Sequence, residues 1–372
     1  SGIPNALNNL TQSFSAWAQS PGDTVARQTV IDRATSLATT FQDTAAALAS
    51  AKQNTEQQLQ STVDQVNQLL GKLQGFNAQI MRGSRTDPAM DAQVNSALEQ
   101  LSQYIDFTAL QQTDGSVTVL MNGQTPLLVE DRKYQIQYRL VQPETPTYAG
   151  RPSAQVTAAD GADITQISTG GQLGALLNVR NSVLPSYIGD SFQPGDLNTM
   201  AKQIADRVNQ LLTPVDTSSG TPGATGVPIF TYDANNDVNV ASTILVISTV
   251  TPNLLAAADP GPPAVSNGVP LALSALSNGT KTADQINGLT YSQFFGSMAS
   301  RIGAALNDAT GQQQIQQSAV AQAKNIRQQT SGVSLDEEAT ILIQFQRAYD
   351  ANSRLISVLD QITQDAINIL HA

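Results

Sequence analysis

The sequence predicts a mainly α-helical protein with a β insert (an α+β fold), in which an elongated long-helix bundle domain carries a small antiparallel β domain. Two observations predict this class. Apolar residues recur at steps of three and four toward both ends of the chain, as on one face of a helix. Between these regions, residues 107–168 alternate apolar and polar side chains around Asp-Gly pairs, as β-hairpins do.

Residues 1–106 are predicted to form the first part of the bundle. A first helix is indicated by a regular run of apolar residues: Ile3, Leu7, Leu10, Phe14 and Trp17. "SPGD" (20–23) interrupts that helix, and Asp23 suits the N-cap of the next one. An apolar stripe then continues to Ile80, so residues 24–82 predict one helix about 90 Å long at 1.5 Å per residue. A long bundle helix and part of a filament or stalk both explain that length.

A shorter helix is predicted over residues 85–102, with Asp87 as its N-cap and Pro88 at its first position. Residues 107–168 then form the small β domain. Its clearest hairpin turns at Asp114-Gly115, and two further stretches, 133–142 and 153–168, alternate in the same way.

Helical spacing returns at residues 169–212, which are predicted as a helix pair that rejoins the bundle. Residues 213–282 are rich in Pro, Gly and Ser, with one strand expected over Ile244–Val250, and they belong either to an outer β domain or to the helical domain. Residues 283–332 are predicted as a long bundle helix, opened by the capping box "TYSQ" at 290–293.

The last segment, residues 333–372, is predicted as a heptad helix. Ser334 is placed to cap it, and Glu337 lies at the third helical position, from which its carboxylate reaches back to the cap. Capping accounts for this acidic cluster better than catalysis, because acid–base work needs a second carboxylate or histidine in the same cleft and the sequence identifies none.

Behind the cap, apolar residues repeat every seven positions with a four–three offset, as in a coiled coil. The face is wider than a two-stranded seam requires, which favours burial against other subunits over docking on the helix's own domain. The residues of this predicted assembly face are Ile341, Leu342, Phe345, Tyr349, Leu355, Ile356, Leu359, Ile362 and Ile369.

Composition argues against several other functions. The formal charge is −11 and the 19 basic residues are dispersed, so no nucleic-acid partner is expected. Apolar runs such as "ILVI" (244–247) are too short to span a bilayer. There is no cysteine, and "DANND" (233–237) lacks the glycine of a calcium loop. No catalytic, cofactor or metal site is predicted, and the chain is not expected to be an enzyme.

Five segments resemble one known family. "SGVSLDEEATILIQFQRAYDANSRLISVLDQITQDAINIL" (331–370) closely resembles the carboxy-terminal signature of the flagellar axial proteins. Internal segments at 20–42, 61–80, 112–129 and 170–211 are similar to the branch of that family that joins the hook to the filament. Relative to that family, the chain is expected to begin after the amino-terminal helical segment.

The resemblance implies an extracellular structural protein of the bacterial flagellum that serves motility, exported unfolded by the flagellar type III apparatus without a cleaved signal peptide. It implies self-assembly at the hook–filament junction through terminal helices. The expected partners are copies of itself, the hook protein, the second hook–filament junction protein and a flagellar export chaperone that covers the apolar face. Another axial component (hook, rod or second junction protein) is the nearest alternative. An extracellular enzyme on a helical stalk is a more distant one.

Overall fold

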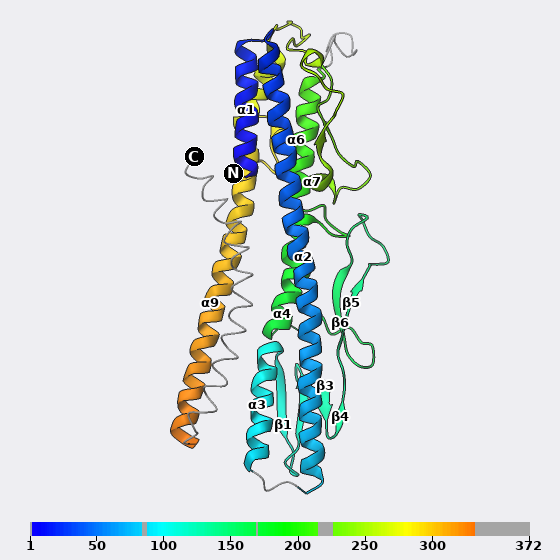
Figure 1. The fold of residues 1–372 in the computed structure, drawn as a ribbon, viewed down its shortest axis with the longest axis vertical. Helices are drawn as coiled ribbons and strands as arrows, with labels where there is room; N and C mark the ends of the chain where they lie inside the picture. Colours follow the sequence, from blue (N-terminus) through cyan, green and yellow to red (C-terminus); the bar gives the residue numbers. More distant parts are fainter. Residues whose placement is uncertain (1, 84–87, 169, 215–225, 332–372) are drawn as a thin grey trace. The chain divides into compact units, whose positions relative to one another are not determined.

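The computed structural model describes residues 2–83, 88–168, 170–214 and 226–331. The fold is mainly helical with small antiparallel sheets, as the sequence predicts (Figure 1). Two compact units share the chain: the first takes residues 1–40, 203–231 and 245–372, and the second takes residues 41–202 and 232–244. Two long helices, α2 and α6, contribute residues to both units.

The first unit is built around α1 (Ile3–Gln19), which packs against α8 (Gly268–Ser274) and the 3-10 turn η3 (Ala275–Asn278). The predicted apolar run forms its buried face, because Leu10, Phe14 and Trp17 are fully buried. Asn267 donates its side-chain N–H to the carbonyl of Ala18 at 2.9 Å and so closes the end of α1.

Helix α2 (Thr24–Met81) is a single helix of 58 residues, which confirms the prediction over 24–82. Asp23 caps it as expected, since the Val25 amide donates to its Oδ1 at 2.8 Å. The predicted stripe is buried from Val30 to Phe41 and again from Thr55 to Ile80. Between these stretches, residues 42–54 contribute no buried side chain.

The remaining elements of the first unit are short, apart from α9. β7 (Phe230–Thr231) pairs antiparallel with β8 (Leu245–Val246). The strand expected over Ile244–Val250 is therefore much shorter, because the chain turns where the Val250 amide donates to the Ile247 carbonyl at 3.0 Å. Two 3-10 turns, η2 (Pro252–Leu254) and η4 (Thr282–Asp284), connect these segments to the last helix.

The final described helix, α9 (Tyr291–Ser331), opens with the predicted capping box. The Thr290 amide donates to Gln293 Oε1 at 3.0 Å, and the Gln293 amide donates to Thr290 Oγ1 at 3.3 Å, which are the two reciprocal bonds of that motif. The first turns bury Tyr291, Phe294 and Met298.

The second unit contains an antiparallel four-stranded sheet of order β1-β2-β3-β4. Its strands are β1 (Phe107–Gln111), β2 (Val117–Met121), β3 (Thr125–Val129) and β4 (Arg132–Lys133). The hairpin predicted at Asp114-Gly115 joins β1 to β2. The turn from β2 to β3 places Asn122 and Gly123 at φ 49° and 70°, the left-handed pair that an Asn-Gly hairpin turn requires.

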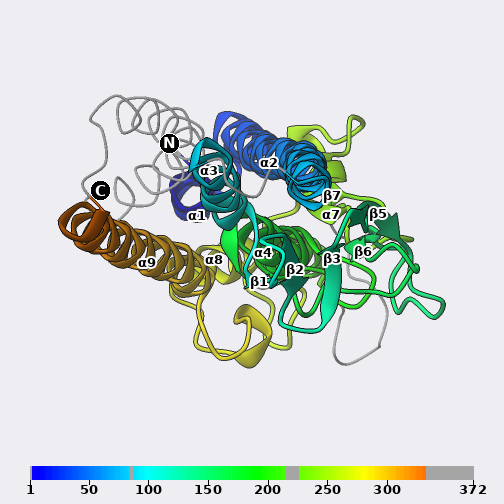
Figure 2. The same ribbon diagram turned by 90° about the horizontal axis from the view of Figure 1, so that it is seen from below.

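A separate two-stranded sheet pairs β5 (Gln137–Val141) with β6 (Ser153–Thr157), and Figure 2 shows the two strands side by side. The sequence predicts instead a strand–turn–strand unit within 153–168. Only an isolated bridge between Thr157 and Asp163 forms there. Side chains of Asn181 and Thr165 occupy that edge of β6, bonding the backbone amides of Ala154 and Val156 at 2.9 Å each.

Helix α2 and two of the helices that follow it share one core with the strands, with buried residues such as Leu70, Leu101 and Leu173. α3 (Pro88–Tyr104) starts at Pro88 as expected, while Asp87 lies outside the described residues. The helix pair expected over 169–212 is a run of four elements: α4 (Gly171–Asn178), the π-helix η1 (Val179–Val183), α5 (Leu184–Ile188) and α6 (Asp196–Leu212). The short helix α7 (Val240–Thr243) completes the unit.

Amide side chains of α2 hydrogen-bond the backbone of the four-stranded sheet and of the segment that follows it. Asn77 is fully buried; it donates to the carbonyls of Val117 (2.8 Å) and Glu130 (2.6 Å) and accepts from the Val117 amide (2.9 Å). Asn67 bonds both backbone groups of Ile136, and Gln74 bonds the carbonyl of Asp131. These bonds satisfy backbone groups that burial would otherwise penalise, and they fix the register of strand against helix.

Candidate functional site

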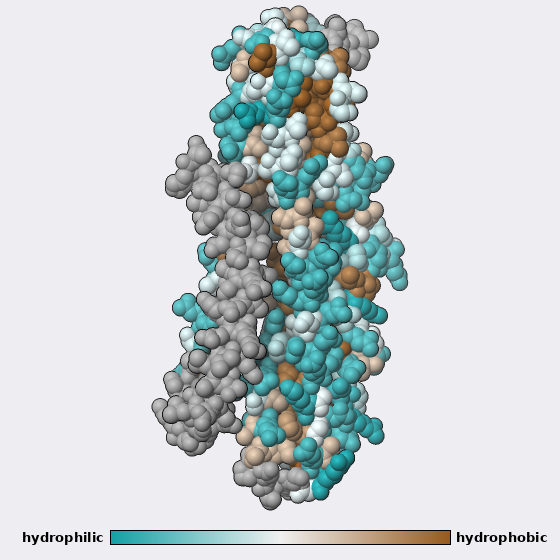
Figure 3. Space-filling view, in the orientation of Figure 1, coloured by the Kyte–Doolittle hydropathy of each residue, from teal (hydrophilic) through white to brown (hydrophobic). Residues whose placement is uncertain are grey.

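The predicted assembly face and its cap, including Ser334, Glu337, Phe345 and Leu355, lie outside the described residues, as does the whole of 332–372. The structure therefore does not place them. The described residues have large apolar side chains exposed only at scattered positions, which is ordinary for a protein surface. On the face drawn in Figure 3, hydrophobic residues form separate patches among hydrophilic and intermediate ones.

The densest group of charged side chains in the second unit surrounds Glu56 on α2. One carboxylate oxygen, Oε1, accepts from Arg180 through Nε (2.8 Å) and Nη2 (2.7 Å), and from the Lys52 ammonium at 3.1 Å. Arg180 is 3% exposed, and its Nη2 also donates to the carbonyl of Pro152 at 2.7 Å. Arg180 comes from the π-helix η1, an irregularity that often occurs at functional positions.

Two more polar groups adjoin this cluster without being bonded into it. Among the described residues, no hydrogen-bond acceptor or donor meets the buried Arg151 Nη1 or the buried Tyr138 hydroxyl. Arg151 immediately precedes the segment that enters β6, and Tyr138 is on β5. Among the described residues, Glu56 is the carboxylate that contacts Lys52 and Arg180, and Arg151 lies close enough to feel its charge, so the group carries an excess of positive charge.

The electrostatics follow from burial and from this excess. Burial lowers the pKa of Lys52, and nearby Arg180 lowers it further, although the bond to Glu56 opposes the shift. Burial and Arg180 together lower the pKa of Arg151. Burial, with the negative charge of Glu56, raises the pKa of Tyr138 to about 12. Lys52 and Arg151 are thus in surroundings that favour an additional negative group.

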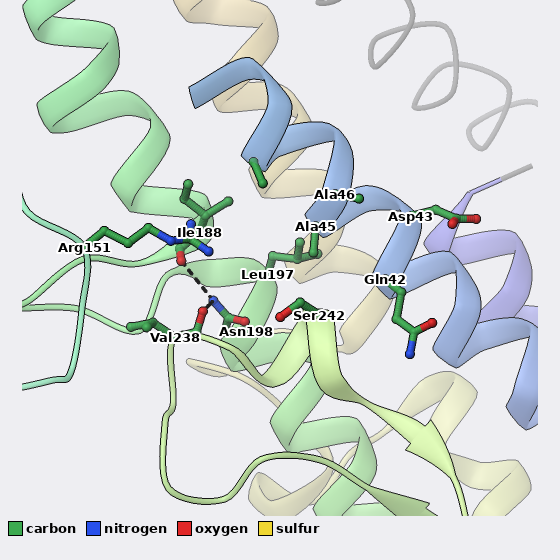
Figure 4. Close-up of a pocket in the computed structure, with 11 residues that line it drawn as sticks. Gln42, Asp43, Ala45, Ala46, Arg151, Ile188, Leu197, Asn198, Val238 and Ser242 are labelled. Atoms are coloured by element: carbon green, nitrogen blue, oxygen red, sulfur yellow. Dashed lines mark hydrogen bonds between the residues drawn. The ribbon is translucent and has the colours of Figure 1, made fainter. Parts of the chain in front are cut away.

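Arg151 also lines a pocket of about 420 Å³ in the second unit (Figure 4). The floor is the part of α2 without buried side chains, where small residues leave room. The opposite wall comes from α5, α6 and the segment around α7. The lining residues are Gln42, Asp43, Ala45, Ala46, Ala49, Arg151, Ile188, Leu197, Asn198, Val238 and Ser242.

Asn198 shapes the inner wall of this pocket. Its side chain donates to the carbonyls of Ile188 (3.1 Å), Pro194 (2.8 Å) and Val238 (3.1 Å), and it accepts from the Ala241 amide at 2.9 Å. Both its nitrogen and its oxygen are engaged by backbone groups, so Asn198 is structural. In Figure 4, Gln42 and Asp43 lie at the end of the pocket away from Arg151.

Sequence reasoning missed both the cluster and the pocket. The only available signal was Lys52, a cation at a stripe position of α2, with Glu56 four residues later. Arg151 and Arg180 carry no recognisable motif. Within the described ranges, no group of three or more His, Cys, Asp or Glu side chains is arranged to hold a metal ion. Among the helices described, none combines the length and apolar character of a membrane crossing.

Comparison with known families gives two matches. Residues 1–230 match the flagellar hook-associated protein FlgK helical domain. Residues 327–369 match the flagellar basal body rod FlgEFG protein C-terminal family. The second match spans the predicted assembly face from Ile341 to Ile369.

Individual relatives agree with these matches. Flagellar hook-associated protein 1 of Bacillus subtilis is 24% identical over 407 aligned positions, which cover 99% of this chain and 76% of that protein. The solved structure of the flagellar hook junction protein FlgK from Burkholderia pseudomallei aligns with a TM-score of 0.51 and 25% identity. That alignment covers 63% of this chain and 41% of the Burkholderia chain, so this chain spans less than half of that structure.

Proposed function

Because the chain belongs to the family of the flagellar hook-associated protein FlgK, we propose that it is a structural component of the bacterial flagellum that assembles at the hook–filament junction. The observation that carries the proposal is the helical-domain match over residues 1–230, more than half of the chain. A protein of this kind works by holding neighbours in place.

The carboxy-terminal match gives the proposal its mechanism. Residues 327–369 resemble the end of rod and hook proteins, and this stretch contains nine apolar residues on one predicted helix face. Burying such side chains contributes about 1.5–3 kcal/mol each. Nine of them supply on the order of 15–25 kcal/mol before ordering costs, which exceeds most estimates of the entropy lost on association. The face therefore supplies a driving force for contact with sister copies.

The same face defines the other partners we propose. The hook protein and the second hook–filament junction protein meet the assembled copies on either side. An export chaperone covers the apolar face before assembly, because an exposed stripe of this size would otherwise aggregate. Export unfolded through the flagellar type III apparatus fits a chain without cysteine, in which no disulfide restricts the conformation. No catalytic role is proposed.

The proposal is tested with a triple variant, Phe345→Asp, Leu355→Asp and Leu359→Asp. Three carboxylates on the assembly face would each need to be desolvated in the contact, so binding to hook tips should be lost. The measurement is labelling of hook tips in the electron microscope, with motility of the corresponding strain as a second readout.

The matched control places three aspartates on exposed positions of α2: Ala47→Asp, Asn54→Asp and Gln60→Asp. It changes the net charge equally and should leave tip binding intact. Tip binding by the first variant at the level of the unmodified chain would overturn the role given to residues 341–369. Binding of the unmodified chain to rods or to hook sides, and not to tips, would favour another axial component.

A further inference from the structure

The pocket beside Arg151 has the features of a ligand site. We propose that it binds a carboxylate carried on an aliphatic stem, with the Arg151 guanidinium as the group that recognises the carboxylate. The site differs from the assembly face of the proposed function and does not depend on it. Its volume of about 420 Å³ lies within the range of small-molecule sites, roughly 300–1,000 Å³.

Charge is the first argument. Among the described residues, Glu56 is the carboxylate that contacts Lys52 and Arg180, and it directs one oxygen to both; Arg151 lies near Glu56 and Arg180 without contacting either carboxylate oxygen. An uncompensated group of cations is unusual in a chain with a formal charge of −11. Arg151 is the member of this group that lines the pocket, so a negative ligand there would be attracted by all three cations at once.

Hydrogen bonding is the second argument. Nη1 of Arg151 is buried and has no acceptor among the described residues. Leaving a buried guanidinium nitrogen without an acceptor costs more than leaving a neutral donor unpaired. Planar carboxylates match the fork of N–H groups on arginine, so a carboxylate is the acceptor that this group selects. Because Nη1 has almost no accessible surface in this structure, the Arg151 side chain must turn toward the pocket to form that bond.

The remaining walls decide between a carboxylate and a phosphate. Beyond Arg151 the pocket is lined mainly by apolar side chains: Ala45, Ala46, Ala49, Ile188, Leu197 and Val238. A phosphate, charged over its whole surface, would lose hydration against these walls without replacement. An aliphatic stem would instead bury apolar surface there.

Two sources can present this chemistry: a free organic acid and a glutamate side chain of a second copy. Both are tested first with sodium glutarate as the probe. Thermal unfolding of the chain is followed in rising glutarate and in sodium chloride at equal ionic strength. The midpoint should rise with glutarate by more than with chloride, since a ligand that binds only the folded state stabilises it.

Arg151→Gln should abolish the glutarate-specific shift while leaving the chain folded. Arg139→Gln is the matched control, because Arg139 is exposed on β5 and bonds Gln155 rather than the cluster. This control should keep the full shift. Equal glutarate shifts in the unmodified chain and in Arg151→Gln, or no specific shift at all, would overturn the proposal. An equal or larger shift with inorganic phosphate would overturn the assignment to an aliphatic carboxylate.

Sedimentation then identifies the source. If a second copy supplies the carboxylate, glutarate and Arg151→Gln should each reduce self-association of the chain, and Arg139→Gln should not. If the ligand is a free acid, self-association should be the same for the unmodified chain with glutarate, for Arg151→Gln and for Arg139→Gln. Glutarate should still raise the unfolding midpoint of the unmodified chain. Failure of hook-tip binding by the unmodified chain would overturn the proposed function and leave this site standing.

Discussion

At the scale of single residues, asparagines on helices act as connectors to the backbone of other segments. Asn67, Asn77, Asn181 and Asn198 each pair side-chain oxygen and nitrogen with main-chain groups of the second unit, and Asn209 does so in the first. An amide side chain can donate and accept at once, so it replaces a neighbouring strand. These contacts are buried or half-buried, where each carries more energy than at the surface.

Asn77→Ala should lower the free energy of unfolding by roughly 2–4 kcal/mol, because three backbone groups lose their partner in a buried setting. Urea denaturation measures the change. Asn54→Ala, at an exposed position of the same helix, should change stability by less than about 0.5 kcal/mol. If Asn77→Ala lowers the free energy of unfolding no more than Asn54→Ala does, the connector role is refuted.

The second prediction at the residue scale is a loss of stability at alkaline pH that depends on Tyr291. Burial, with the charge of Asp284, raises its pKa from 10.0 to about 12. The folded state thus holds the proton more tightly than the unfolded state. The resulting stability is complete below pH 10 and is lost as pH rises toward 12, on the order of 2 kcal/mol in total.

Tyr291→Phe should remove that part of the stability loss at alkaline pH. At pH 8 the variant should be as stable as the unmodified chain or slightly more stable, because within the described residues the hydroxyl has no hydrogen-bond partner. Urea midpoints at pH 8 and pH 11 provide the comparison. A marked loss of stability at pH 8 would show that the hydroxyl is bonded.

Some residue roles could be predicted from sequence and others could not. Asp23 and the Thr290–Gln293 box were identified because caps act within four residues of the chain. Asn77 was recognised only as a stripe position. Its partners are 40 and 53 residues away, and no local pattern shows which backbone group an amide will meet.

At the scale of elements, the start of α9 depends on its cap. Thr290→Ala should lower stability by about 1 kcal/mol, since the Gln293 amide loses its acceptor. Ser292→Ala, exposed in the same first turn, is the comparison. Far-ultraviolet circular dichroism during urea unfolding reports both variants. Equal midpoints for the two would exclude a role for the reciprocal bonds.

The link between α2 and η1 through Glu56 and Arg180 gives a further test. Glu56→Gln should destabilise the chain by roughly 2–4 kcal/mol, because Arg180 stays charged and buried beside Lys52 without its carboxylate. Adding Arg180→Met should recover much of the loss. Asp64→Asn, an exposed position on α2, controls for the change in net charge. A double variant less stable than Glu56→Gln would contradict this account.

Long helices and tight hairpins were predictable because their periodicity extends over many residues. The β5–β6 pairing was not, since both strands have alternative partners of similar pattern. The choice depends on which edge Asn181 and Thr165 occupy. The π-helix η1 could not be predicted from the sequence either, because one extra residue in a turn leaves the apolar spacing almost unchanged.

At the scale of the whole molecule, net charge opposes association. Copies with a formal charge of −11 repel one another, and salt screens this repulsion over about 10 Å at 0.1 M. Self-association through the assembly face should therefore strengthen from 20 mM to 500 mM sodium chloride. Sedimentation velocity at fixed protein concentration measures it. Weaker association at high salt would show that attractive charge contacts dominate the interface.

The pocket illustrates why a site can escape sequence reasoning. Its lining comes from residues 42–49, Arg151, 188–198 and 238–242, stretches that only the fold brings together. The assembly face is the opposite case. All of its residues lie within one predicted helix, so their seven-residue period and family resemblance are visible in the chain itself, and their placement stays a prediction.

The spacing of the amides along α2 also limits how this gene can change in length. Asn67, Gln74 and Asn77 must all point toward the same strands, and each inserted residue would rotate everything beyond it by about 100°. Even a seven-residue insertion, which comes within about 20° of two full turns, would move the amides beyond it about 10 Å along the helix. Natural variants should therefore keep the length from Asn67 to Asn77 unchanged.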